Sequence, residues 1–354
     1  MSSMPIEPYR MLADALDRLP SGFPRTSSGL EIELLKWMFK PEEAELASRL
    51  TREYEVSDHI TLRAGLGSAE AEKLLSDMAR KGLIWSANRD RKTTYRLAPW
   101  IVGLYEAQVD SMDHRFAHLV EDYFQEGGMV GLMKPLPSLH RVVPAQGATK
   151  SEWILPYDDV RKLIESCKTF AVDDCVCRKQ QDMLGNRKCD FPIHNCMRFS
   201  KFERPPREGD VSKEEALALL EETERIGLVH TVSNVVEGLN YMCNCCGCYC
   251  GILRGVTDFG LKNSVAVANY YASVDADSCT GCGLCERRCQ VKAISLKEGV
   301  ASVDRDKCIG CGLCASGCPV GAATIQLKPE EERVEPPRDY RVWEDDRLRN
   351  RGLL

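Results

Sequence analysis

The sequence predicts an α+β protein built from several domains. Its 354 residues are too many for one ordinary hydrophobic core, and a composition of 44% hydrophobic and 28% charged residues is typical of a folded chain. Helical periodicity and short alternating strand patterns occur in separate stretches. All 18 cysteines lie between Cys167 and Cys318, so a cysteine-free N-terminal region precedes a cysteine-rich remainder.

Residues 1–100 have the pattern of helices followed by a hairpin. "EIELLKWMFKPEEAELASRL" and "VSDHITLRAGLGSAEAEKLLSDMARKGLIW" have helical periodicity, with Ser68 as the expected N-cap of the last helix. "LIWSANRDRKTTYRL" alternates as two short strands around a polar turn. This order, over residues 28–98, resembles a winged helix-turn-helix domain of the kind common in bacterial regulators.

In a DNA-reading domain of this kind, the helix from Ser68 to Lys81 would enter the major groove. Its exposed face carries charges of both signs, a poor match to phosphates: Glu70, Lys73, Asp77 and Arg80. Only the expected wing is basic, with Arg89, Arg91 and Lys92. The net charge of −6 also disfavours a general affinity for nucleic acid, so a docking or structural role is favoured over DNA binding, which stays open.

The middle of the chain is read as a helical linker, residues 101–138, and a cysteine-rich α+β domain, residues 139–270. "RVVPAQ" and "EWILPY" are expected strands, "YDDVRKLIESCKTF" an expected helix, and "FAVDDCVC" a strand that runs into a ligand loop. In "SKEEALALLEETERIG", Ser212 and Glu215 form a capping box, and Gly227 ends the helix.

Residues 271–328 contain a repeated cysteine motif with the spacing C-x2-C-x2-C-x3-C. The first copy is Cys279, Cys282, Cys285 and Cys289, and the second is Cys308, Cys311, Cys314 and Cys318. The motif resembles that of the bacterial two-cluster ferredoxin, over residues 271–327, with two structural zinc sites as the alternative. By this resemblance, one [4Fe–4S] cluster is bound by Cys279, Cys282, Cys285 and Cys318, and the other by Cys308, Cys311, Cys314 and Cys289.

The first repeat departs from that family at one position. The family has proline after the fourth cysteine; this chain has Pro319 in the second repeat but Gln290 in the first. Since proline mainly fixes the turn, the change is expected to affect exposure and potential rather than cluster binding. The residues after the repeat, 329–354, are read as a charged, extended C-terminal arm that packs through Tyr340 and Trp343.

The remaining cysteines fall into two groups and one isolated residue. Cys167 lies on an apolar helical face and is expected to pack in the core. The others are candidate metal or cluster ligands that are expected to lie in loops: Cys175, Cys177, Cys189, Cys196, Cys243, Cys245, Cys246, Cys248 and Cys250. Nearby cations such as Arg178 favour thiolates. Because Cys245 and Cys246 are adjacent and point apart in an extended chain, two centres are expected to share the segment 243–250.

Three kinds of middle-domain centre stay open. One or two further [4Fe–4S] clusters are favoured, structural zinc is the second reading, and a catalytic or non-cubane cluster is the third. The third rests on the "CCG" at Cys245 to Gly247, which resembles the cysteine-rich domain of heterodisulfide reductases. His194 and His230 are candidate extra ligands that more often would be structural. Residues 140–327 as a whole are similar to multi-domain 4Fe–4S binding proteins of anaerobic bacteria and archaea.

The predicted function is single-electron transfer through at least two [4Fe–4S] clusters on behalf of a partner redox enzyme. The chain has no Walker A loop and no GxGxxG after a strand, so an electron-transfer protein or oxidoreductase subunit is favoured over a stand-alone enzyme. The alternative is a redox-sensing transcription regulator that uses the winged helix. Neither a membrane span nor a signal peptide is expected, and reduced cysteines favour the cytoplasm.

Overall fold

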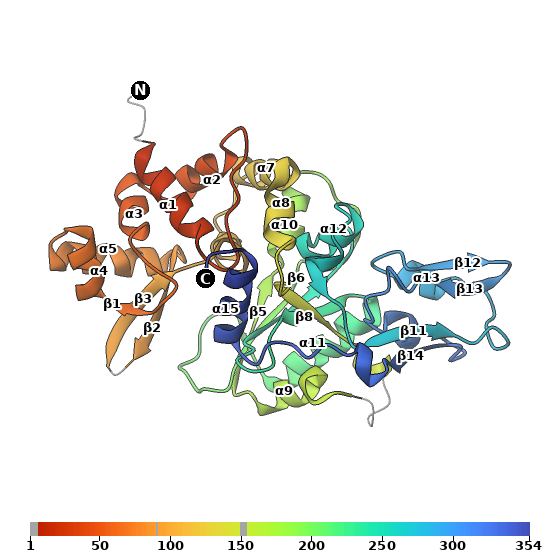
Figure 1. Cartoon of the computed structure of the whole chain (residues 1–354). Coiled ribbons are helices and arrows are strands. Elements are labelled where there is room, and N and C mark those ends of the chain that lie inside the picture. Colours follow the sequence, from red (N-terminus) through yellow and green to blue (C-terminus); the bar gives the residue numbers. More distant parts are fainter. Residues whose placement is uncertain (1–5, 90, 149–153) are drawn as a thin grey trace. The chain divides into compact units, whose positions relative to one another are not determined.

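The computed structural model describes residues 6–89, 91–148 and 154–354. The chain forms two compact units, which are described separately below (Figure 1). The first unit comprises residues 1–135, 180–186 and 347–354, and the second comprises residues 136–179 and 187–346. Helix and strand are both abundant, which confirms the predicted α+β class.

The first unit is mainly helical, with one small antiparallel sheet in the order β1-β3-β2. Its elements are α1 (Glu7–Asp17), α2 (Leu30–Met38), α3 (Pro41–Ala47), β1 (Glu55–Val56), α4 (Ser57–Ala64), α5 (Ser68–Arg80), β2 (Ile84–Arg89), β3 (Lys92–Leu97), α6 (Tyr105–Ala107), α7 (His114–Tyr123) and α8 (Met129–Met133). The expected helices and hairpin are therefore present, in the expected order. Membership of the winged-helix family stays a prediction.

Two details of this unit differ from expectation or add to it. The N-cap of α5 is Gly67, with no side-chain hydrogen bond, so the prediction of Ser68 as the cap was wrong: Ser68 is the first helical residue. Residues 101–135 of the predicted linker, 101–138, belong to this unit: the ring centre of Tyr123 lies 5.4 Å from that of Phe23, which also lies 5.3 Å from the ring centre of Trp100.

The second unit contains a seven-stranded sheet in the order β10-β4-β8-β9-β6-β5-β7, and every neighbouring pair except β10 and β4 is antiparallel. Its strands are β4 (His140–Val143), β5 (Thr169–Asp174), β6 (His194–Ser200), β7 (Asp210–Val211), β8 (Val229–Ser233), β9 (Tyr241–Cys245) and β10 (Val265–Ala266). Its helices are α9 (Val160–Ser166), α10 (Val176–Met183), of which residues 176–179 belong to this unit, α11 (Lys213–Ile226) and α12 (Gly251–Thr257).

One face of this sheet packs against α9 and α11 (Figure 1). Phe170, Met197 and Met242 project from three strands into a core completed by Ile164 of α9 and Leu220 of α11. Because side chains alternate across a strand, the neighbours of these strand residues face the opposite side of the sheet. That alternation decides which face carries the cysteines.

The ends of α11 follow the sequence prediction. Ser212 Oγ accepts from the Glu215 backbone N–H at 3.1 Å, the Glu215 carboxylate accepts from the Ser212 N–H at 2.8 Å, and Gly227 ends the helix in the left-handed conformation. The predicted strand "EWILPY" was wrong in its described part. Pro156–Asp158 form a 3-10 turn, since proline fixes φ and gives no donor to a strand ladder.

Residues 270–327 add two small two-stranded antiparallel sheets and two short helices to the second unit. These are β11 (Tyr270–Val274) paired with β14 (Ala323–Leu327), β12 (Ile294–Lys297) paired with β13 (Val300–Val303), α13 (Leu284–Arg288) and α14 (Leu313–Ser316). Each short helix follows a left-handed glycine, Gly283 or Gly312, and the two repeats are thus folded alike.

The C-terminal segment is not the extended arm that was predicted, because residues 340–350 form the helix α15 (Tyr340–Asn350). Asp339 starts it: its carboxylate accepts from the Val342 N–H at 3.0 Å. The predicted packing residues do make contacts, since Tyr340 OH donates to Ser233 Oγ at 2.7 Å and Trp343 Nε1 donates to the Ser138 carbonyl at 3.0 Å. Among the described residues, no helix is both long and apolar enough to cross a membrane.

Candidate functional site

Nine cysteines of the second unit form two sets, and the larger set lies at the sheet face opposite α9 and α11. Cys196 lies in β6, and Cys243 and Cys245 lie in β9, where they alternate with the core residues of the same strands. The pairing of Met197 with Met242 brings β6 and β9 together in the register that makes Cys196 and Cys243 neighbours. These ligand candidates were expected in loops, but regular strand pairing positions three of them.

Three more cysteines reach the same place from helix starts. Cys175 directly precedes α10, Cys177 lies in its first turn, and Cys250 is the N-cap residue of α12. Together with the strand cysteines they form a closed circuit in which each thiol shifts the pKa of the next, in the order Cys175, Cys177, Cys250, Cys245, Cys243, Cys196 and back to Cys175. The Cys250 thiol donates to Cys245 Sγ at 3.2 Å. We name these six residues the six-thiol ring.

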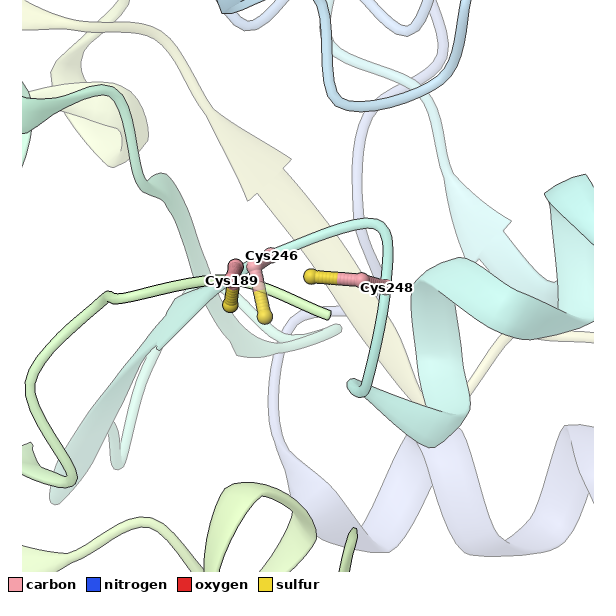
Figure 2. A group of neighbouring side chains, drawn as sticks. All are labelled: Cys189, Cys246 and Cys248. Carbon is pink, nitrogen blue, oxygen red and sulfur yellow. The ribbon is translucent and has the colours of Figure 1, made fainter. Parts of the chain in front are cut away.

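The other three cysteines form a second group. The Sγ atoms of Cys189, Cys246 and Cys248 all lie within 4.8 Å of one another. Figure 2 shows Cys248 pointing across its turn toward Cys189 and Cys246, which belong to separate parts of the chain. We name these residues the three-thiol group; within the described chain, no fourth thiol, imidazole or carboxylate belongs to it.

The two sets divide the segment 243–250 between them. The six-thiol ring takes Cys243, Cys245 and Cys250, and the three-thiol group takes Cys246 and Cys248. Adjacent Cys245 and Cys246 therefore serve different sets, in the way that the alternation of an extended chain had suggested.

Arg178 is buried and lies near both sets. Its guanidinium donates to the Asn195 side chain at 2.8 Å, to the Pro192 carbonyl at 2.7 Å and to the Asn244 carbonyl. Burial alone would lower the pKa of Arg178, but the negative charges of Cys175, Cys246 and Cys245 raise it above its usual value. The cation is thus held in place to offset thiolate charge.

Two thiols have acidic pKa values as a result. Hydrogen bonds from Cys243 and Cys250 lower the pKa of Cys245 to about 6, and a hydrogen bond from Cys248 lowers the pKa of Cys246 to about 5, with a further contribution from Arg178. Both shifts favour the thiolate, which is the form of cysteine that binds metals. The chemistry of the two sets therefore suits metal or iron–sulfur ligation.

The eight cysteines of the C-terminal repeats also form two sets. A pocket is lined by Cys279, Cys282 and Cys285 of the first repeat and by Cys318 of the second. Its remaining walls are mainly small or apolar, among them Val274 and Ala301. The four thiols that the ferredoxin resemblance assigned to one cluster thus surround one space.

The other four C-terminal cysteines are also close to one another, and their site is more buried. Burial, together with the charges of Cys308 and Cys289, raises the pKa of Cys314 to about 12. Burial likewise raises the pKa of Cys311, where Cys314 is the next cause. Cys282 of the first set, by contrast, is exposed. The two C-terminal sets therefore differ in their access to solvent.

Glycines allow the C-terminal loops to approach backbone closely. A Cβ at Gly281 would lie 2.2 Å from the Gly299 carbonyl oxygen, and one at Gly310 would lie 2.4 Å from the Tyr270 carbonyl oxygen. Both residues also have positive φ, of 66° and 72°. Backbone N–H groups of Ala293 and Ala323 donate to Sγ of Cys289 and Cys318, at 3.1 and 3.4 Å. The donor set, the pocket and these N–H···S bonds fit a pair of thiolate-bound iron–sulfur clusters.

The comparison with known families agrees with this geometry. Residues 271–327 match the family described as the 4Fe-4S dicluster domain. We name residues 271–327 the dicluster domain after this match. A search of curated proteins finds none that matches the chain.

The remaining candidates lie outside the thiol sets. Cys167 is buried in the core beside α9, as expected, although it follows the helix rather than lying within it. His194 is exposed and contacts Asp174 Oδ1 at 3.0 Å, while burial lowers the pKa of His230 to about 4 and its Nδ1 contacts Asn244 Oδ1 at 2.7 Å. Neither histidine belongs to a metal-suited group among the described residues.

The N-terminal residues proposed for DNA reading make local contacts. Arg80 pairs with Asp77 on the same helix, and the Arg89 guanidinium lies 4.6 Å from the ring centre of Tyr54. These contacts leave a face of mixed charge, and DNA binding stays a prediction.

Sequence reasoning missed several supporting residues. Thr231 Oγ1 lies 3.4 Å from Cys245 Sγ, and Tyr249 OH accepts from the Cys189 N–H at 3.2 Å. Gln290, noted only as a departure from the family, accepts from the Gly247 N–H at 2.9 Å. No local sequence pattern predicts these contacts. They form only when distant strands pair and the dicluster domain packs against the middle domain.

Proposed function

We propose that this protein transfers single electrons through two [4Fe–4S] clusters in its dicluster domain, and that the middle-domain thiols bind further redox or metal centres. One cluster is assigned to Cys279, Cys282, Cys285 and Cys318, and the other to Cys308, Cys311, Cys314 and Cys289. The observation that carries the proposal is the pocket that three cysteines of one repeat and Cys318 of the other line together. Bound clusters would supply reversible one-electron chemistry at potentials that sulfur hydrogen bonds and solvent exposure adjust.

The exposed residues around the first C-terminal cysteine set suggest where a redox partner approaches a cluster. Cys282 is exposed, and Leu296 and Val320 in the same pocket wall are 37% and 47% exposed. An apolar rim around an accessible cluster ligand is suited to a transient redox partner. We therefore assign electron exchange with an external redox protein to this end of the dicluster domain.

In the middle domain, the structure supports two separate centres rather than one. The six-thiol ring offers more sulfur than one tetrahedral ion or one cubane uses, and the three-thiol group leaves a fourth position to water or another ligand. Arg178 offsets the charge of both. We favour iron–sulfur clusters here, with structural zinc as the alternative.

All 18 cysteines lie in the described part of the chain, and none of them forms a disulfide there. Thiols in this number favour a reducing compartment, so we propose the cytoplasm as the location. The proposed role is that of an electron carrier or oxidoreductase subunit that serves a partner enzyme.

The test is the iron and acid-labile sulfide content of anaerobically purified protein. Two serine pairs separate the middle-domain sets: Cys243→Ser with Cys245→Ser in the six-thiol ring, and Cys246→Ser with Cys248→Ser in the three-thiol group. We expect about eight iron atoms per chain from the dicluster domain in every variant, and a further metal content that each pair lowers separately. Cys167→Ala is the control, because this thiol is buried outside both sets.

Fewer than about eight iron atoms in the reconstituted wild-type chain would contradict the two-cluster assignment. If both serine pairs keep the wild-type metal content, the proposed middle-domain centres are contradicted, and the two-cluster assignment of the dicluster domain still holds.

A further inference from the structure

The dicluster domain and the three-thiol group meet at a backbone-to-backbone contact within the second unit. Gly247, which lies between Cys246 and Cys248, donates its N–H to Gln290 Oε1 at 2.9 Å. A Cβ at Gly247 would lie 1.8 Å from the backbone carbonyl oxygen of Gln290. Only glycine fits this position, so no side chain separates the two loops.

Gln290 and Arg288 are fixed from the side of the middle domain, and Cys289 lies between them. Gln290 Nε2 donates to the Gly227 carbonyl at 2.9 Å. The Arg288 guanidinium donates to the carbonyls of Glu224 and Arg225, at 2.9 and 2.7 Å. These acceptors are at the C-terminal end of α11, where helix carbonyls lack helical partners and attract cations.

Two further hydrogen bonds hold the same cluster site. The Ala145 N–H donates to the Cys311 carbonyl at 2.9 Å, and the Arg288 Nε donates to the Leu313 carbonyl at 2.9 Å. Cys289 and Cys311 therefore belong to the thiol set that contacts the middle domain, whereas Cys282 of the other set is exposed. The set with Cys289 and Cys311 is therefore the inner set, next to the middle domain, and the set with Cys282 is the outer set, open to solvent.

The residue at the contact is the one that departs from the ferredoxin pattern. Pro319 occupies the corresponding position of the second repeat, and proline has neither an amide side chain nor a backbone donor. A proline at position 290 would lose both the bond to Gly247 and the bond to Gly227. The change from proline to glutamine thus creates the connection between Cys289 and the Cys246–Cys248 turn.

We propose that Gln290 is a positioning residue for electron transfer between the Cys289-containing cluster and a redox centre in the three-thiol group. This inference rests on the proposed function. In each transfer, the inner cluster is oxidised by one electron and the three-thiol centre is reduced by one electron, with no bond made or broken. The electron enters from an external one-electron reductant at the exposed end of the dicluster domain. Electron transfer slows steeply as contacts between donor and acceptor are lost, so the hydrogen bond and the close backbone approach set its rate.

The test compares three substitutions at one residue in anaerobic holoprotein. Gln290→Leu removes both hydrogen bonds at similar size, Gln290→Pro restores the family residue, and Gln290→Glu keeps the acceptor for the Gly247 N–H. Gln326→Leu, on the exposed side of β14, is the matched control. Dithionite is the reductant, and freeze-quench electron paramagnetic resonance follows the dicluster signals and the middle-domain signal separately.

We expect unchanged iron content and unchanged dicluster reduction in all four variants. Reduction of the middle-domain centre slows several-fold in Gln290→Leu and Gln290→Pro, and stays near the wild-type rate in Gln290→Glu and Gln326→Leu. If Gln290 had only a structural role, its substitution would lower thermal stability or iron content. It would not slow reduction of the middle-domain centre relative to reduction of the dicluster domain.

Wild-type rates at the middle-domain centre in Gln290→Leu and Gln290→Pro would overturn the proposal. So would a three-thiol group that binds only zinc, because zinc has no redox chemistry. In both cases about eight iron atoms with normal dicluster signals would leave the proposed function intact, whereas loss of those signals from the wild type would overturn that function itself. If the substitutions prevent cluster binding, the test is the spin–spin interaction between the Cys289-containing cluster and the three-thiol centre in the reduced wild type. Absence of that interaction would overturn the proposal.

Discussion

The two cysteine-rich regions of this chain are built by opposite means. In the dicluster domain, short tight loops with glycines and the small helices that follow them carry the cysteines. In the six-thiol ring of the middle domain, strand alternation and the starts of two helices place them, and the members of the ring come from distant segments. The first design depends on local backbone freedom, and the second depends on the register of a sheet.

The difference teaches where each region is vulnerable. The loops of the dicluster domain need particular glycines and the contribution of one cysteine from the other repeat. The six-thiol ring needs the pairing of β6 with β9 and of β8 with β9. A change that leaves spacing intact but alters sheet register should therefore affect only the middle domain.

The largest expected effect comes from removing cluster ligands in the outer C-terminal set. In Cys282→Ser with Cys285→Ser, we expect a loss of about four iron atoms per chain, because half of one ligand set is gone. Metal analysis and electron paramagnetic resonance of anaerobic protein would measure it, with Cys167→Ala as the control. Simultaneous loss of the middle-domain metal would contradict the separation of the two regions.

The glycine dependence of the dicluster loops gives the next largest effect. Gly281→Ala places a Cβ 2.2 Å from the Gly299 carbonyl oxygen at a φ of 66°. We expect the backbone strain alone to cost roughly 1–3 kcal/mol of stability, with the steric clash added. Denaturant unfolding would measure this cost. Gly67→Ala has open space and no positive φ, so it serves as the control; equal effects of the two changes would contradict the explanation.

We expect a smaller difference between the two regions in their stability at low pH. Residues 271–327 contain no histidine, whereas the middle domain buries His140. Burial lowers the pKa of His140 to about 4 from 6.5. A depressed folded-state pKa means that the unfolded chain takes up the proton first, so stability is complete above pH 6.5 and falls as the pH drops toward 4. Between pH 7 and 5 the loss from His140 alone is about 2 kcal/mol, and buried His230, whose pKa is also lowered to about 4, adds a similar loss.

The measurement is the free energy of unfolding against pH in wild type and His140→Gln. The variant should show a shallower pH dependence, since one of the two buried titrating histidines is absent while His230 remains. An identical slope in both proteins would exclude His140 as the origin of the acid sensitivity.

The smallest expected effect concerns the scaffold that both regions share. Ser212→Ala removes the N-cap of α11, whose other end binds Arg288 of the dicluster domain. We expect a loss of about 1 kcal/mol in unfolding free energy and unchanged metal content. Ser295→Ala, exposed on β12, is the control. A fall in iron content with Ser212→Ala would show that helix stability and cluster binding are more closely linked than the structure indicates.

Sequence reasoning succeeded where the determining interactions are local. The α11 capping box and the β2–β3 hairpin depend on residues a few positions apart, and both were predicted from such patterns. Prediction from the sequence failed where contacts between distant residues, or small differences between neighbouring residues, decide the structure. The described part of "EWILPY" is a turn, Gly67 rather than Ser68 caps α5, and the charged C-terminal segment forms α15 after Asp339.

By itself, then, the sequence determined the repeated cysteine spacing and hence the dicluster domain, because such loops close over neighbouring residues. It also determined that Cys245 and Cys246 would point apart, because alternation is a property of any extended chain. Only the tertiary structure decided that nine cysteines divide into a ring of six and a group of three, and that Gln290 meets Gly247. These outcomes depend on which strands pair, in which register, and on which helix end receives Arg288, and those contacts join residues far apart in the chain.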